Sequence, residues 1–255
     1  NDFRYPNLDY YDFFLKNSNH YRKATLEFSG GNEGAQYAFV GGYIGQDGLE
    51  KVGKTRQRDR FNIRGDLDIK INNFISGFIT TAVAFDLNSG GALSVQDEMT
   101  AISTHRPNEY PIFIPETIIP ADSAGYPILG ASNTITDNLY GSMVYGGWQK
   151  EQNIVGQFNI GLNFDFNRFL KGLTAKTQLT FDNEFYGLES LSTTTSTYSQ
   201  RWVKTSDGRD SVIMIMRKKS DKNDNITLSD SYTNRTTSFL GSLNFEREFA
   251  DNQSI

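Results

Sequence analysis

The chain has 255 residues, a formal net charge of −5 and no cysteine. Without cysteine, disulfide scaffolds, thiolate metal sites and cysteine nucleophiles are excluded, and the acidic balance argues against a broad nucleic-acid-binding surface. The two histidines leave little material for a histidine-rich metal site. The aromatic content of 13% and the 23 glycines, at a mean hydropathy of −0.50, are typical of a membrane β-barrel, in which apolar and polar residues alternate.

Strands are predicted from apolar residues that recur at every second position. In the segment 60–71, apolar residues and one glycine occupy the odd positions, and charged or amide residues occupy the even ones. Segments 154–166 and 173–185 repeat this pattern, and four other segments show it more weakly. In chain order, the predicted strands are 23–30, 36–45, 60–71, 74–87, 154–166, 173–185 and 237–249.

Strands of this kind form either a transmembrane barrel or a soluble antiparallel sandwich, which also alternates. Most of the predicted strands reach the length of about 9–11 residues that spans a bilayer at a tilt, and three apolar faces carry no charge. We therefore predict an all-β fold, an antiparallel transmembrane β-barrel with long extracellular loops. A bacterial barrel needs an even number of strands, at least about eight, so residues 1–255 are expected to form one partial β-barrel domain of a larger protein.

The predicted connections alternate between short and long. Short ones fall at 31–34, 72–73 and 167–172, and the longest fall near 88–150 and 187–234. Outer-membrane barrels place short turns on the periplasmic side and long loops outside, so this alternation predicts the direction of each strand. The first long loop is expected to contain a short helix near 94–103, and the second a hairpin about the turn Asp207-Gly208.

Four segments carry a resemblance to a known family: DYYDFF at 9–14, LEFSGGNE at 26–33, YAFVGGY at 37–43 and RDRFNIR at 58–64. Over residues 8–87 the sequence resembles the SusC/RagA-like family of TonB-dependent outer-membrane transporters of Bacteroidetes. Members of this family have a barrel of roughly 22 strands around an N-terminal plug. By this resemblance the chain looks like the second to about the eighth barrel strand, without the plug.

The resemblance also implies a function, a location and partners. The function is TonB-dependent active import of oligosaccharides or peptides across the outer membrane of a Bacteroidetes-like Gram-negative cell. The expected partners are a SusD-like lipoprotein lid, TonB through the missing plug region, outer-membrane lipid and the imported substrate. No nucleophile–base pair or phosphate-binding motif is readable, so we predict no enzymatic activity, no cofactor and no nucleic-acid partner. The alternative function is that of a soluble carbohydrate-binding β-sandwich module.

Candidate site residues fall into two groups. Charged residues at alternate positions of one strand are expected to line the barrel lumen, where they either contact the plug or substrate or form a salt-bridged ladder between strands. Amides and loop aromatics are candidates for ligand binding, with packing as their alternative role. The lumen or plug contacts are Arg60, Arg64, Asp66, Asp68 and Lys70, and the ligand-binding candidates are Tyr110, Tyr126, Trp148, Gln157, Asn159 and Asn163. The run 221–225 has alternate oxygen ligands but lacks the glycine and glutamate of an EF-hand, so we expect a solvated loop and no metal site.

Overall fold

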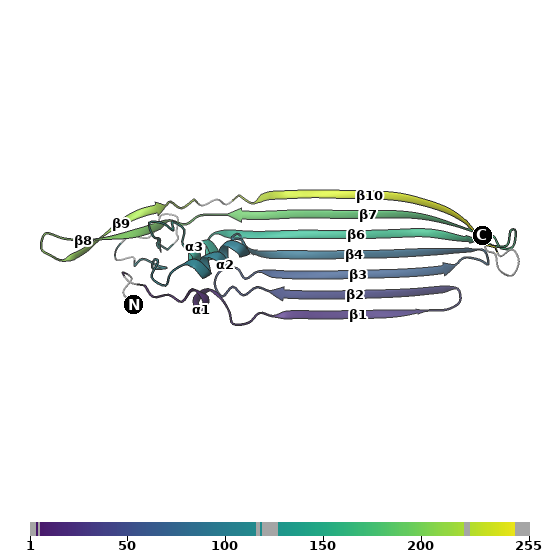
Figure 1. Cartoon of the computed structure of the whole chain (residues 1–255), viewed down its shortest axis with the longest axis horizontal. Coiled ribbons are helices and arrows are strands. Elements are labelled where there is room, and N and C mark those ends of the chain that lie inside the picture. The colour runs from purple at the N-terminus through teal and green to yellow at the C-terminus, as the bar shows by residue number, and fades with distance from the viewer. Residues whose placement is uncertain (1–3, 5, 116–117, 119–126, 222–224, 248–255) are drawn as a thin grey trace.

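The computed structural model describes residues 4, 6–115, 118, 127–221 and 225–247. Its largest part is a seven-stranded antiparallel sheet, here called the main sheet, in which the strands lie in the order β1-β2-β3-β4-β6-β7-β10 (Figure 1). The predicted all-β, antiparallel class is therefore confirmed. The strands are β1 (Tyr21–Gly31), β2 (Ala35–Asp47), β3 (Gln57–Lys70), β4 (Ile75–Gly91), β6 (Gly147–Asp165), β7 (Leu173–Ser192) and β10 (Thr227–Phe245).

Each predicted strand corresponds to one strand of the main sheet, but several boundaries differ. β10 begins at Thr227 and not at residue 237. The prediction missed its first half because that half consists largely of serine, threonine, asparagine and charged residues and shows no apolar alternation. β6 and β7 likewise extend beyond the predicted strands toward the long connections. The last residues of the predicted segment 237–249 lie outside the described residues.

The register of the sheet brings all apolar rows to one side. Residues directly opposite each other in neighbouring strands point to the same face, and Ile63 pairs with Val83, which pairs with Gly156. The same holds along every strand, so one face, here called the apolar face, carries the aliphatic and aromatic side chains. It includes Leu26, Phe28, Phe39, Phe61, Ile63, Ile79, Phe158, Ile160, Leu162, Leu179, Phe181, Phe239 and Leu243.

The apolar face has no covering layer within the described residues. All buried hydrophobic side chains lie outside the seven strands of the main sheet. Leu26, Phe239 and Leu243 are 62%, 74% and 70% exposed. A soluble sheet buries one face against another element, and the part of the chain that the structure describes supplies no such element for this face.

Charges on the apolar face lie in the half of the strands nearest the long connections. Arg22 pairs with Asp47 at 2.9 Å, the Tyr43 hydroxyl donates to Asp59 at 2.6 Å, and Arg235 Nε donates to Asn183 at 3.2 Å. Between these positions and the short turns, the apolar face is free of charge. This charge-free part covers 61–69 in β3, 75–91 in β4, 152–164 in β6, 173–187 in β7 and 237–245 in β10.

Three helices and a three-stranded sheet gather at the end with the long connections, and we call this assembly the cap (Figure 1). α2 confirms the helix predicted near 94–103, and the β8–β9 hairpin confirms the predicted turn, where Gly208 has a φ of +80°. The helix at 10–14 was not predicted. The elements are α1 (Tyr10–Phe14), α2 (Val95–Thr104), α3 (Leu139–Val144), β5 (Leu129–Gly130), β8 (Thr197–Lys204) and β9 (Asp210–Lys218). No helix among the described residues is long and apolar enough to cross a membrane.

The cap has a hydrophobic core of its own, built around Phe14, Ile102, Tyr110 and Leu139. Asn138 fastens this core, because its side-chain Nδ2 donates to the carbonyls of Ile112 and Gly130 at 3.1 and 2.8 Å. Its Oδ1 also accepts from the Gly141 amide and so caps the start of α3. One buried amide therefore joins α3 to the small sheet.

The short turns gather at the opposite end of the main sheet. Asn32 Oδ1 accepts hydrogen bonds from the Gly34 and Ala35 amides, and Asn72 Oδ1 accepts from the amides of residues 74 and 75. Asparagine favours such turns because its side chain replaces a backbone acceptor. At the third turn Gly172 has a φ of +91°, and a Cβ there would lie 1.9 Å from the carbonyl oxygen of Glu246.

A buried ion cluster attaches the cap to the main sheet. The Arg56 guanidinium, just before β3, pairs with Glu50 and with Glu98 of α2, and it also donates to the Leu93 carbonyl. Burial raises the pKa of Glu98, and the neighbouring guanidinium opposes this rise. Because both carboxylates are almost fully buried, the single positive charge of Arg56 is shared between two acidic side chains that water hardly solvates.

We predict that Arg56→Ala loosens the cap. Removing one member of a buried charge cluster costs about 3–5 kcal/mol, because the remaining charges lose their partner without regaining water. Hydrogen exchange at the α2 amides should accelerate accordingly. Lys51→Ala is the control, since the Lys51–Asp12 pair is exposed and lies at 3.7 Å. Equal protection of α2 in both variants would contradict the role of the cluster.

Candidate functional site

The face opposite the apolar face, here called the polar face, is the candidate site. The five charged residues predicted as lumen or plug contacts all lie on it, in the even-numbered row of β3: Arg60, Arg64, Asp66, Asp68 and Lys70. The three amides predicted on β6 lie on the same face, because Arg64 pairs with Ala82 and Ala82 pairs with Gln157. The register therefore brings residues about 90 positions apart in sequence onto one polar surface.

The charged row of β3 forms few ion pairs. Arg64 Nε donates to Asp66 Oδ2 at 3.0 Å, but these residues belong to the same strand. The cross-strand pair in this region is Arg58–Asp86, between β3 and β4. A ladder of ion pairs between strands, one of the two roles expected for this row, is thus limited among the described residues to its end nearest the cap. The side chains of Asp68 and Lys70 are exposed on the polar face.

The amide row of β6 is partly organised by hydrogen bonds. Asn159 Oδ1 accepts from the Thr180 hydroxyl at 2.6 Å and from Gln178 Nε2 at 3.3 Å, and both donors lie on β7. Gln157 and Asn163 are exposed. The row therefore offers amide donors and acceptors to a polar ligand or to water, with Asn159 held in a fixed orientation.

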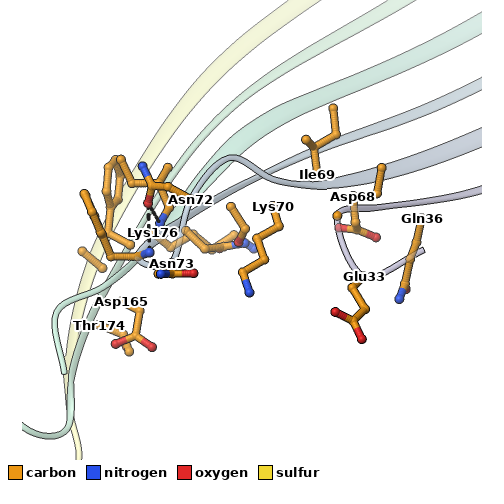
Figure 2. Close-up of a pocket in the computed structure, with 18 of the residues that line it drawn as sticks. Glu33, Gln36, Asp68, Ile69, Lys70, Asn72, Asn73, Asp165, Thr174 and Lys176 are labelled. Carbon is orange, nitrogen blue, oxygen red and sulfur yellow. Dashed lines mark hydrogen bonds between the residues drawn. The ribbon is translucent and has the colours of Figure 1, made fainter. Parts of the chain in front are cut away.

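The polar face is hollowed at its short-turn end (Figure 2). The hollow has a volume of about 620 Å³ and is lined by the first two turns, by the strand ends at Asp165 and Thr174, and by Asp68, Lys70, Asn163 and Lys176. Figure 2 shows Asp68 and Lys70 on the concave side of the curved strands, while Ile69 points to the other side. Carboxylates, ammonium groups and amides share this concave surface, as expected for a wall that faces water or a polar protein surface.

The loop aromatics do not join this site. Tyr110, predicted to face a ligand, is only 1% exposed and belongs to the cap core. Its hydroxyl accepts from the Leu139 amide at 3.2 Å, and burial raises its pKa to about 12. Trp148, also predicted to contact a ligand, lies in the even-numbered row of β6 and therefore on the apolar-face side. Tyr126 lies outside the described residues.

Sequence reasoning missed a pair of stacked tyrosines on the polar face. The rings of Tyr186 and Tyr232 have centroids 5.3 Å apart and are inclined by only 20°. The Tyr232 hydroxyl donates to Glu184 Oε1 at 3.1 Å. Tyr232 is in the half of β10 that shows no alternation, so the sequence did not reveal that it lies opposite Tyr186. A flat aromatic surface beside a carboxylate suits a sugar ring or a peptide side chain.

Metal binding has no support in the described residues. Among them, no three histidine, aspartate or glutamate side chains are close enough to hold an ion. Residues 222–224 of the run 221–225 lie outside the described part of the chain.

No protein-family model matches the chain, and a search of curated proteins gives no significant match. The functional argument therefore depends on the two faces of the main sheet and on the cap.

We predict that the two faces respond differently to the same substitution. Thr180→Val removes a donor to Asn159 and should lower the free energy of unfolding by about 1 kcal/mol. Thr177 lies three residues earlier on β7 but on the apolar face. Thr177→Val places an apolar side chain among other apolar side chains and should leave the free energy of unfolding nearly unchanged. Thermal unfolding in detergent, followed by circular dichroism, measures both. Equal losses would show that the faces do not differ as described.

Proposed function

We propose that the chain forms part of the wall of an outer-membrane β-barrel that imports oligosaccharides or peptides in a TonB-dependent manner. The observation that carries the proposal is the apolar face, which has exposed apolar side chains on six long strands and half-buried ones on β4. It is free of charge over a span close to the 9–11 residues of a transmembrane strand. In water such a face would cost about 25 cal/mol for each Å² of apolar surface. Hydrocarbon removes that cost without a second protein layer.

The open edges of the main sheet favour a barrel. β1 and β10 are exposed along their whole lengths, and each pairs with one strand only. Unpaired strand edges in a membrane leave backbone groups without partners, so spanning sheets close into barrels. Further strands of the same barrel would complete both edges of this sheet, in keeping with the resemblance to the SusC/RagA-like family.

The other features support a role in import. The polar face would line the lumen, with its hollow at the periplasmic end available to a plug and the Tyr186–Tyr232 pair nearer the outside. The cap would stand on the extracellular side, where a SusD-like lid and the substrate arrive. A soluble carbohydrate-binding sandwich, the alternative, requires a second sheet over the apolar face, and no described element supplies it.

We predict an alternating pattern of chemical access along β6. Residues 1–255 contain no cysteine, and the parent protein gives the background labelling against which each introduced cysteine is read. Gln157→Cys and Asn159→Cys should react with a charged maleimide in isolated outer membranes. Phe158→Cys and Ile160→Cys should react only with a lipid-soluble maleimide, because hydrocarbon excludes the charged reagent.

A different result would favour the sandwich. If the purified protein is monodisperse without detergent, and Phe158→Cys and Ile160→Cys react with neither reagent, the apolar face is buried against protein and the barrel proposal fails.

We also predict that Tyr232→Ala reduces import. Aromatic stacking contributes about 0.5–1.5 kcal/mol, so uptake of labelled oligosaccharides or peptides by cells should fall by roughly two- to tenfold. Tyr232→Phe keeps the ring and should retain most of the uptake. Equal surface expression of the variants is the control. Uptake that persists in cells without TonB would contradict the proposed dependence of import on TonB.

A further inference from the structure

A smaller hollow lies where the main sheet meets the cap. Its volume is about 420 Å³, and its lining includes Lys54, Thr55, Trp148 and Lys150. The register places Trp148 and Lys150 in the row of β6 that continues into Ile154, which is the apolar-face row. These two side chains therefore face the same side as the apolar face and not the polar face.

The hollow is cationic. The Nζ atoms of Lys54 and Lys150 lie 5.5 and 5.2 Å from the centroid of the Trp148 ring, on which both ammonium groups are held by cation–π attraction. Within the described part of the chain, neither ammonium forms an ion pair. Lys16 does not line the hollow, but its Nζ donates to Oγ1 of the lining residue Thr55 at 3.2 Å.

The acidic surroundings do not neutralise this charge. Glu189 lies directly opposite Lys150 in the register of β6 and β7 and is the acidic residue that shares its face. Glu151 belongs to the other row of β6, and Glu50 and Glu98, which share the Arg56 guanidinium, do not line the hollow. Among the described residues, two ammonium groups thus line the hollow and no carboxylate does, so an anion would be attracted to it.

We propose that this hollow binds the phosphate of a lipid headgroup in the outer leaflet of the membrane. The inference depends on the proposed function, because it requires the apolar face to meet lipid. Lys150 lies four residues from Ile154 on the cap side, about 13 Å along the strand. Its charge therefore lies between the cap and the charge-free part of the apolar face. Headgroups occupy this level, tryptophan prefers it, and lysines there attract anionic lipids.

The position favours a lipid over a soluble anion. A substrate moving along the polar face does not reach a hollow on the other side of β6. A lipid lying against the apolar face has its headgroup at the hollow already, and its acyl chains can pack on Ile154 and its neighbours in the same row.

The test uses the full-length protein in detergent, and a Trp148→Phe variant supplies the fluorescence background that does not come from Trp148. Titration with lipid A should produce a saturable change in Trp148 fluorescence, and dephosphorylated lipid A should not. Lys54→Gln/Lys150→Gln should weaken the apparent affinity about thirtyfold, through the loss of two near-surface charge interactions. Lys23→Gln/Lys51→Gln removes the same charge elsewhere and should bind like the parent.

Three outcomes would overturn the inference. Equal responses to the two forms of lipid A would show that phosphate is not recognised. Saturable binding of inorganic phosphate with equal affinity would assign the hollow to a soluble anion. Equal losses in both double variants would indicate a nonspecific charge effect. Each of these leaves the cysteine pattern along β6 intact, whereas failure of the proposed function would abolish that pattern.

Discussion

An exposed apolar face is the constraint on which the rest of the structure depends. Hydrophobic burial is the dominant favourable term in folding, yet every buried hydrophobic side chain of the described residues lies in the cap. The main sheet is held by backbone pairing and by contacts between neighbours such as Phe28 and Phe39, whose ring centroids lie 4.8 Å apart. Such a sheet needs surroundings that solvate apolar side chains, and a bilayer provides them without a second protein layer.

The period-two pattern predicted the main sheet because burial in lipid or protein imposes it residue by residue. Segment 60–71 shows it clearly, and β3 follows it. The pattern disappears where strands leave the apolar band, so the first half of β10 could not be predicted from alternation. There the chain remains extended because β7 supplies hydrogen-bonding partners up to Ser190, and pairing of this kind leaves no trace in local composition.

The candidate site was predictable only in part, for a related reason. Alternation within one strand assigns Arg60 and Lys70 to one face, and the structure keeps them there. Which residues of distant strands share that face depends on register, which one strand does not encode. The stacked tyrosines illustrate this, since their contact requires the pairing of β7 with β10. Tyr110 shows the converse, because an aromatic residue in a long loop can fill a core as readily as bind a ligand.

The cap and the main sheet obtain their stability in different ways, and this division bears on function. The cap buries its apolar side chains within itself and holds Asn138 by three hydrogen bonds. The main sheet depends on what surrounds it. Arg56 connects the two by pairing with both Glu50 and Glu98 at their junction. In the proposed barrel, a structured cap on the extracellular side, fixed to a lipid-facing wall, would place recognition outside the membrane and passage along the polar face. A binding module that works in solution does not require this arrangement.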